Sequence, residues 1–477
     1  MTRLLGYFAR LGDTVKTLSL TLARFACLAA ACFVAAQDHP AAETAIRHVT
    51  VVNVATGGEL KDQTIRIQGN RIASIAATQE ADASLPGVDA HGGYLIPGLW
   101  DMHVHVHEPY ELGLYVANGV TGVRIMSGER DTAAYRAELL RQAISPQIYL
   151  ASAIMDGSSP VWPGSIVVKN AAEARRAVGE IKAGGADFIK VYSRLSREAY
   201  FALADEAKQQ HIAFEGHVPD DVTAREASAA GQRSIEHLLG VGMACSKRQD
   251  SLMGDLSHAE FFRQRLAIEA EAFRTFDEAK RQALFAEFRS NETWQVPTLT
   301  VLRLWGRLDD SKFTSDPRLA YIGGRSRDRW QERIQPMRRW TNQEFQLARS
   351  LFSMDQRMVG WMFRAGVPLM AGTDAMNPYC FPGFGLHDEL ALMVEAGLTP
   401  LAALQAATIN PAKFMGRSAE LGTVEAGKIA DLVLLRADPL ADIHNTTQIQ
   451  AVWLQGKYFD EEARARMLET AKQAARH

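Results

Sequence analysis

The stretch PGLWDMHVH, residues 97–105, begins as an apolar strand and ends in alternating histidines. Side chains two residues apart on a strand point to the same face, so His103 and His105 could hold one cation together. His107 continues the alternation, and spacing alone also allows the pair His105 and His107. A lone His-x-His pair is a weak signal, because buried histidines often have structural roles. Whether the histidine pair binds a metal ion must therefore be judged from other residues of the chain.

Apolar segments of strand length recur along the chain on either side of this stretch. They cover residues 93–103, 119–126, 147–154, 186–192, 211–217, 233–237, 294–301 and 367–373. Continuous apolar runs are typical of parallel strands buried on both faces, and helical stretches separate most of them. This alternation predicts an α/β fold, the (β/α)8 TIM barrel, over residues 98–419. We expect the charged and largely helical stretch over about residues 245–350 to be an insertion.

Capping residues mark the starts of several expected helices. Ser196 precedes one helix, and Thr223 with Glu226 forms a capping box before the next. Thr399-Pro400 and Asn410-Pro411 each place a cap residue before a proline that would occupy the first helical position.

Two β-rich pieces flank this central region. Residues 44–97 contain β-branched runs separated by glycine turns, and residues 420–462 contain two further apolar strands. The two pieces predict one small β-sandwich-like domain that is built from both ends of the chain.

Four further polar residues end expected strands, namely Lys190, His217, His237 and Asp374. Barrel active sites are assembled at the C-terminal ends of the strands. Each residue taken singly could be a loop residue or a solvated charge, but six polar residues in that position are improbable by chance. An unpaired ammonium at the end of a buried strand would also be costly, so Lys190 calls for a specific environment.

Several longer motifs accompany these residues: FIKVY at 188–192, AAGQRSIEH at 229–237, GTDA at 372–375, ATINPA at 407–412 and GTVEAGKIAD at 422–431. Together with residues 97–105, they resemble the amidohydrolase superfamily of the binuclear metal type. Within it, they are most similar to the imidazolonepropionase-like and prolidase-like branch. The resemblance covers nearly the whole chain after residue 36.

The resemblance implies a site with two divalent metal ions. His103, His105 and Asp374 would bind the first ion, and His217 and His237 the second. Lys190, carbamylated by CO2 to N6-carboxylysine, would bridge both ions, and Asp101 fixes the 103/105 register. Imidazole and carboxylate ligands suit zinc, while manganese and cobalt stay open.

The implied reaction is hydrolysis of an amide or peptide-like C–N bond in a small molecule, such as a dipeptide or an N-acyl amino acid. A metal-bridging hydroxide would attack the carbonyl, and Asp374 would pass its proton to the leaving nitrogen. Hydrolysis of an ester, lactone or organophosphate at the same site is the alternative. A non-catalytic metal-binding protein is a third reading.

The substrate is not specified by these motifs. Relatives with dipeptidase-like activity often have a tyrosine two residues after the strand-five histidine, where this chain has Pro219. Tyr192 or Tyr379 could take its place, and Trp162, Tyr192 and Tyr379 are candidates for the pocket wall. Loop side chains decide specificity, and the fold alone does not.

Composition and the N-terminal segment bear on location and partners. The net charge of −3 gives no sign of a nucleic-acid partner, and no apolar run is long enough to span a bilayer. Basic residues precede the apolar run 25–36, which predicts a signal peptide over residues 1–36 and a periplasmic or secreted protein. Ala29 disfavours lipid anchoring at Cys32. The oligomeric state is open, and a homo-oligomer is compatible with the sequence.

Two cysteines, Cys245 and Cys380, follow that segment, and both are expected in loops on the active-site face. An oxidising compartment would allow a bridge between them only if their Cα atoms lie within about 7 Å.

Overall fold

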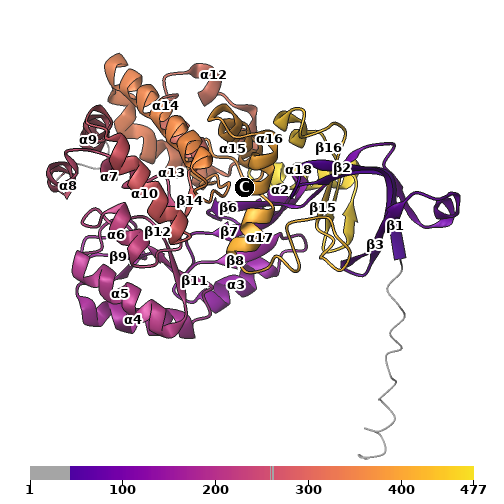
Figure 1. The fold of residues 1–477 in the computed structure, drawn as a ribbon, viewed down its shortest axis with the longest axis horizontal. Helices are drawn as coiled ribbons and strands as arrows, with labels where there is room; N and C mark the ends of the chain where they lie inside the picture. The colour runs from indigo at the N-terminus through magenta and orange to yellow at the C-terminus, as the bar shows by residue number, and fades with distance from the viewer. Residues whose placement is uncertain (1–42, 258, 260–262, 477) are drawn as a thin grey trace, which may run out of the picture. The chain divides into compact units, whose positions relative to one another are not determined.

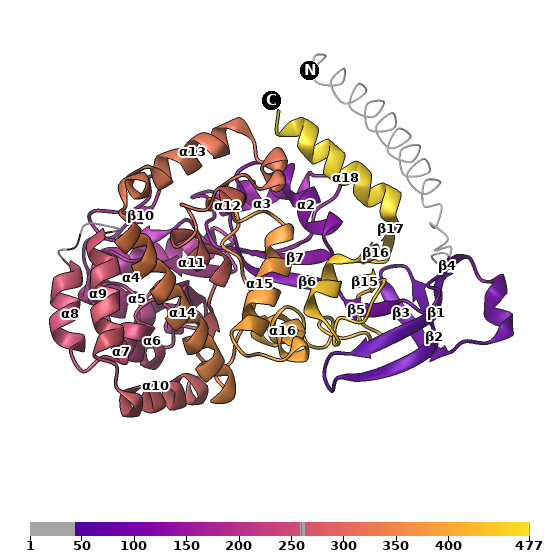
Figure 2. The same cartoon turned by 90° about the horizontal axis from the view of Figure 1, so that it is seen from above.

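The computed structural model describes residues 43–257, 259 and 263–476 of the 477-residue chain. The expected signal peptide over residues 1–36, with Cys32, lies outside the described residues. Figures 1 and 2 show a group of strands covered by helices. Next to it lies a β-rich part that contains the first and the last strands of the described chain. None of the helices in the described ranges is long and apolar enough to cross a membrane.

Two parallel sheets form the helix-covered part. The first has the strand order β6-β7-β8, and the second has the order β10-β9-β11-β12-β13-β14. The strands are β6 (Leu99–Val104), β7 (Val120–Ile125), β8 (Gln147–Leu150), β9 (Met155–Asp156), β10 (Ile166–Val167), β11 (Phe188–Val191), β12 (Ala213–Gly216), β13 (Ser234–Glu236) and β14 (Trp294–Val296). The paired strands run parallel, as their continuous apolar sequences predict.

Isolated parallel bridges connect the edges of these sheets. Ala151 pairs with Phe188 between the two sheets, Gln295 pairs with Leu369, and Val104 pairs with Ala375. Residues 369–375 therefore run between β14 and β6. The fold is a TIM-barrel-like α/β arrangement, in which the described strands do not form one continuous closed sheet.

The expected strand over residues 367–373 is not a regular strand. Pro368 has no N–H to donate, the N–H of Ala371 bonds to Ala406, and the N–H of Thr373 is shared between the backbone of His103 and the carboxylate of Asp101. Because neighbouring groups take these bonds, the segment makes only single bridges to its neighbours.

Two other expected strands have different bounds. The strand over 93–103 is divided at Gly98 into β5 (Tyr94–Pro97) and β6, and a Cβ at Gly98 would lie 2.1 Å from the Thr121 hydroxyl oxygen. The strand over 294–301 ends at Val296, because Glu389 accepts the N–H groups of Leu299 and Thr300 and so caps a helix there.

Helices cover the parallel strands, and those outside the insertion are α2 (Glu111–Ala117), α3 (Thr132–Leu140), α4 (Ala171–Ala183), α5 (Arg197–Gln210), α6 (Ala224–Ala229), α15 (Phe384–Glu395), α16 (Pro400–Ala406), α17 (Ile409–Phe414) and α18 (Glu461–Ala474). The stretch from 241 to 364 holds α7 (Val241–Ala244), α8 (Gln249–Ser257), α9 (Arg263–Arg274), α10 (Glu278–Ser290), α11 (Leu299–Trp305), α12 (Ser311–Thr314), α13 (Gly324–Ile334) and α14 (Asn342–Arg364). The largely helical character predicted for residues 245–350 is thus present, with β14 inside it.

Most of the predicted helix caps are confirmed. Ser196 caps α5, Thr223 forms a capping box at α6, and Thr399 caps α16. The prediction for Asn410 is wrong, because α17 already begins at Ile409 and the Asn410 side chain instead donates to the carbonyl of Leu369.

The β-rich part is one mixed sheet with the order β17-β16-β15-β5-β1-β2-β3, and β4 pairs with β1. Its strands are β1 (Glu43–Asn53), β2 (Gly58–Gln68), β3 (Arg71–Ala77), β4 (Gly87–Asp89), β5, β15 (Leu432–Leu435), β16 (Ile449–Leu454) and β17 (Lys457–Phe459). Arg71 of β3 bridges to Ile429, just before β15, so the sheet rolls over a common core. That core includes Ile65, which precedes the parallel strands, and Leu432 and Trp453, which follow them.

Candidate metal centre

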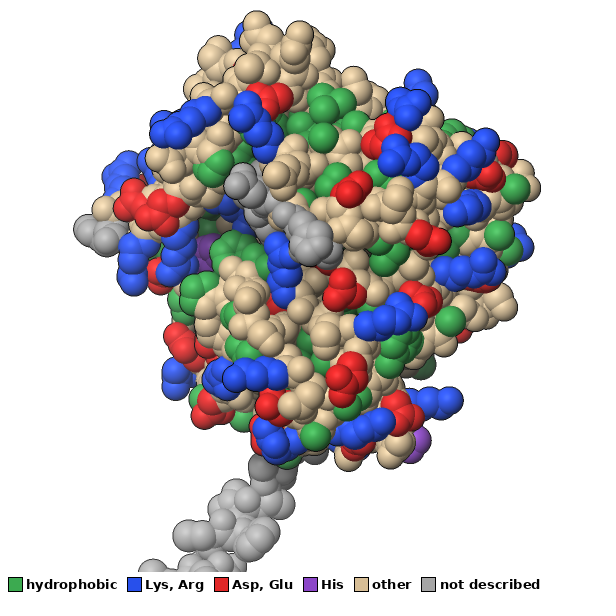
Figure 3. Space-filling model, turned by 90° about the vertical axis from the view of Figure 1, so that its left-hand side faces the viewer, with side chains coloured by type: hydrophobic (Ala, Val, Ile, Leu, Met, Phe, Trp, Pro, Cys, Tyr) green, Lys and Arg blue, Asp and Glu red, His purple; other side chains and the backbone are tan. Residues whose placement is uncertain are grey.

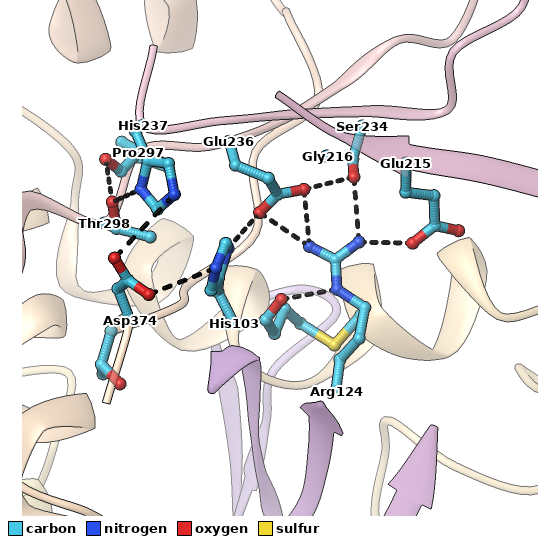
Figure 4. Close-up of polar contacts among 12 residues, drawn as sticks. His103, Arg124, Glu215, Gly216, Ser234, Glu236, His237, Pro297, Thr298 and Asp374 are labelled. Carbon is cyan, nitrogen blue, oxygen red and sulfur yellow. Dashed lines mark hydrogen bonds and ion pairs between the residues drawn. The ribbon is translucent and has the colours of Figure 1, made fainter. Parts of the chain in front are cut away.

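Three ligand-type side chains converge where β6, β13 and the segment 369–375 end. Single ligand atoms of His103, His237 and Asp374 lie within 4.8 Å of one another. The Nε2 atom of His103 is 3.3 Å from Oδ1 of Asp374, and the Nε2 atom of His237 is 3.9 Å from Oδ2 (Figure 4). The centre is buried and holds the donor types that bind divalent transition metals.

Backbone turns direct two of these side chains into the centre. His237 and Asp374 adopt φ values of 59° and 57°, in the left-handed region that costs about 1–3 kcal/mol for residues other than glycine. Each is held by hydrogen bonds: the N–H of His237 donates to Val296, and the N–H of Asp374 donates to His103. Asp101 adds a further constraint, because its carboxylate accepts both the N–H and the hydroxyl of Thr373.

Three histidines present the same ring atom to the centre. The Nδ1 atom of His103 lies 2.6 Å from Glu236, that of His217 lies 2.8 Å from the Ser193 hydroxyl, and that of His237 lies 2.7 Å from the Thr298 hydroxyl. With Nδ1 engaged by the protein, Nε2 remains as the ligand atom in each ring. Such partners fix ring orientation in metal sites.

The other predicted ligands surround this cluster. His105 Nε2 lies 2.9 Å from Oδ1 of Asp374. The His217 ring stands 5.0 Å from that of His237 and stacks on Tyr192 at 3.9 Å. All of them line one cavity together with Lys190. His107 also lines the cavity, but its ring faces the hydroxyl of Ser326, which favours the 103/105 register.

Lys190 is buried at the end of β11, and its Nζ lies 5.8 Å from the centre of the Tyr192 ring. Its ammonium forms no ion pair with any residue in the described ranges. Burial lowers the pKa of Lys190 to about 8. The neutral amine is therefore more accessible near neutral pH than it is for an exposed lysine.

The electrostatics of the centre favour neutral imidazoles and an ionised carboxyl group. Burial lowers the pKa of His105 and His237, the latter to about 3, and lowers that of His217 well below its usual value. Burial opposes ionisation of Asp374, but its contacts with His237, His103 and His105 hold its pKa well below the usual range. Unprotonated imidazole and carboxylate are the forms that coordinate metals.

A network beneath the centre was not predicted from the sequence. Glu236, which holds His103, is paired with Arg124 at 2.9 Å, and Arg124 also donates to Glu215 at 2.7 Å (Figure 4). Arg124, Glu215 and Glu236 are fully buried. The only sequence signals are an arginine inside the apolar strand 120–125 and an acid directly before His237.

The centre opens into a cavity of about 1310 Å³ that is walled mainly by α8, α9, α11, α13 and α14. The space-filling view of this side shows a hollow bordered by basic and hydrophobic side chains (Figure 3). Trp162 and Tyr192 line the cavity, and the Trp162 indole donates to the Tyr192 hydroxyl at 2.7 Å.

Tyr379 does not line the cavity, so its prediction as a wall residue is corrected. It packs behind the wall against Phe313 and Trp330, with ring centres 5.2 and 5.7 Å away. Cys245 and Cys380 are both buried and unpaired, and they belong to different apolar clusters, so no disulfide joins them.

Comparisons with known proteins agree with this geometry. The family model described as "Amidohydrolase family" matches residues 326–458. Imidazolonepropionase of Aromatoleum aromaticum is 40% identical over 83 residues, and that of Pseudomonas savastanoi is 38% identical over 92 residues. These alignments cover 16% and 19% of this chain and 19% and 21% of the relatives, so the chain matches about a fifth of their length.

Solved structures extend the similarity to most of the chain. A bottromycin amidohydrolase has a TM-score of 0.74 and 26% identity, and the match covers 92% of this chain and 91% of that one. A Xaa-Pro dipeptidase with bound methionine has a TM-score of 0.63 and 20% identity, covering 88% and 100% of the two chains, which supports the fold alone. The family model, these relatives and the bottromycin amidohydrolase structure together support the amidohydrolase superfamily as the family of this chain.

Proposed function

We propose that this protein is a metal-dependent hydrolase that cleaves an amide or peptide-like C–N bond in a small molecule. The observation that carries the proposal is the cluster of His103, His237 and Asp374 at the floor of a large, mainly apolar cavity. Pockets of this kind, with a few convergent polar groups, are the usual form of small-molecule sites. The names of the similar proteins, an amidohydrolase and imidazolonepropionases among them, support the C–N bond as the target.

The donor set fits two divalent cations. His103, His105 and Asp374 would hold one ion, and His217 and His237 the other, with zinc favoured by the imidazole and carboxylate donors. Lys190 would join both as a carbamate, since its lowered pKa makes the neutral amine that reacts with CO2 available. When bound, such ions acidify a water molecule and polarise a carbonyl group.

The chain's own residues supply the remaining chemistry. Asp374 is ionised and contacts His103 and His105, so its carboxylate can accept a proton and deliver it to a leaving nitrogen. The Tyr192 hydroxyl stays neutral, because burial raises its pKa to about 12, and it faces the same cavity.

The test compares an amide with its activated ester analogue in the variant Asp374→Asn. An amine leaving group must be protonated as the C–N bond breaks, whereas an activated aryl alcohol leaves as a stable anion. We expect the variant to lose about 10²–10⁴-fold in rate on the amide and far less on the ester. Metal content is measured on the same samples, and Glu332→Gln, a cavity carboxylate away from the centre, is the matched control.

Equal losses on both substrates at full metal occupancy would contradict the proton-transfer role of Asp374. Ester turnover by the wild type without any amide turnover would replace the proposed reaction with ester hydrolysis. Unchanged activity of the variant on both substrates would refute the assignment of the centre.

A further inference from the structure

Helix α13 brings two arginines to the wall of the cavity. Arg329 and Arg333 lie four residues apart, so they share one face of the helix, and both line the cavity. Neighbouring arginines on the same helix are engaged: Arg325 pairs with Glu108, and Arg327 donates to backbone carbonyls. Arg333 differs from them, because its buried Nε has no hydrogen-bond partner among the described residues.

A series of ring contacts links Arg333 to the metal centre. Its guanidinium carbon lies 5.1 Å from the centre of the Trp162 ring. The Trp162 indole donates to the Tyr192 hydroxyl, and Tyr192 in turn stacks on His217. Arg333 is thus connected to a predicted metal ligand through two aromatic side chains, and all four residues line the same cavity.

The chemistry of this position favours an anion. A guanidinium group offers a planar fork of N–H donors that matches a carboxylate, and an aromatic face behind it holds the fork in place. Arg333 forms no ion pair with any described carboxylate, including that of the adjacent Glu332. Tyr192 is a neutral phenol and does not balance the charge. A substrate carboxylate would supply both the missing charge and the missing acceptor.

We propose that Arg333, supported by Trp162, binds a carboxylate of the substrate, and that the substrates are amides with a free carboxylate near the scissile bond. N-acyl amino acids and dipeptides belong to this class. The inference rests on the proposed C–N hydrolysis and adds a specificity-determining residue to it. Because Arg333 belongs to the helical insertion, this specificity would come from the insertion and not from the metal-binding strands.

The experiment uses the metal-loaded protein and two substrates, an N-acyl amino acid and its C-terminal carboxamide, with release of the acyl group followed by chromatography. We expect Arg333→Gln to lower kcat/KM for the acid about 10- to 100-fold, mainly through KM, and to change that for the carboxamide less than about twofold. Arg333→Lys should retain part of the preference. Arg327→Gln, on the same helix but outside the cavity wall, is the matched control and should leave both values unchanged.

Binding is measured in parallel, as quenching of tryptophan fluorescence by the N-acyl amino acid, so that the two proposals can fail separately. If the wild type hydrolyses neither compound but binds the acid, and Arg333→Gln loses that binding, the carboxylate site stands while the proposed reaction fails. If the wild type hydrolyses both compounds and the Arg333→Gln variant, with an unchanged melting temperature, keeps the same ratio between them, the carboxylate site is overturned.

Discussion

Arg124 and Arg333 show two opposite uses of one side chain. Arg124 lies inside the ring of strands, where Nε donates to Met102 and the other nitrogens contact Glu215, Glu236 and Ser234. Arg333 lies in the wall of the cavity above and has an aromatic ring behind it but no carboxylate partner within the part of the chain that the structure describes. A guanidinium group whose N–H donors are all hydrogen-bonded within the protein fixes the positions of its neighbours. A guanidinium group with a free N–H donor can bind a ligand.

The largest expected difference between the two arginines is in protein stability, and it is tested by removing the buried Arg124 side chain. Arg124→Met should leave Glu215 and Glu236 buried without their guanidinium partner and lower the free energy of unfolding by about 3–5 kcal/mol. Arg333→Met should change it by less than about 0.5 kcal/mol, because no internal ion pair is lost. Urea unfolding monitored by circular dichroism checks both variants. Equal stability losses would show that the two arginines do not differ in this way.

Lys190 is the third cation in this comparison, because it is buried like Arg124 but unpaired like Arg333. If it becomes a carbamate, Lys190→Ala should lower the metal content of the purified protein from two ions to one or none. Formate or acetate should restore part of the activity by replacing the lost ligand. Elemental analysis measures the content, with the exposed Lys169→Ala as control. Two retained ions and a full rate without added acid would contradict the bridging role.

Glu236 couples the buried network to the centre, and its removal should act on metal affinity. Glu236→Gln keeps an oxygen that can accept from His103 but loses the charge, so we expect zinc affinity to fall about 10- to 100-fold. Glu215→Gln is the matched control, because Glu215 contacts the same Arg124 but no histidine. Competition with a chromophoric chelator gives both affinities. A similar loss in the control would assign the effect to the ion-pair network as a whole.

Glu111 is a buried carboxyl group without a cationic partner in the described part of the chain, and its predicted effect is confined to the pH dependence of stability. Its Oε2 accepts the N–H of His107, while Oε1 is buried without a partner among the described residues. Burial raises the pKa of Glu111 to about 8 from 4.5, so the folded protein holds a proton that the unfolded chain releases. This contribution to stability is complete below about pH 4.5 and declines as the pH rises to about 8.

Glu111→Gln should therefore flatten the fall in stability between pH 5 and 8, so that the variant loses less stability than the wild type as the pH rises. Melting temperatures across this range, with the partly exposed Glu108→Gln as control, test the prediction. A parallel pH profile for Glu111→Gln and the wild type would contradict it.

The sequence was informative where a residue's role depends on its position within one strand. His103, Lys190, His217 and His237 could be placed because each ends an apolar run, and parallel strands end on the same side. Residues whose role depends on contacts between different strands could not be identified from the sequence. Glu236 lies against Arg124 from a strand more than a hundred residues away, and no local pattern predicts that pair.

The wrong strand bounds have the same cause. Apolar composition does not distinguish a paired strand from a segment whose N–H groups bond elsewhere, as at residues 367–373. Nor does it reveal that Glu389, ninety residues further along the chain, caps the helix that replaces the end of the strand 294–301. Tyr379 is a similar case, since local sequence does not tell which face of a loop an aromatic ring will cover.

The division of one apolar run at Gly98 has a mechanical consequence. β5 belongs to the rolled sheet and β6 carries His103, and a single glycine separates them. The last strand before the site is therefore anchored in the β-rich part by its pairing with β15. A shift of β5 would therefore reach β6, the strand that carries His103, through Gly98. The β-rich part thus holds the strand that leads to His103, although it supplies no predicted ligand to the metal centre.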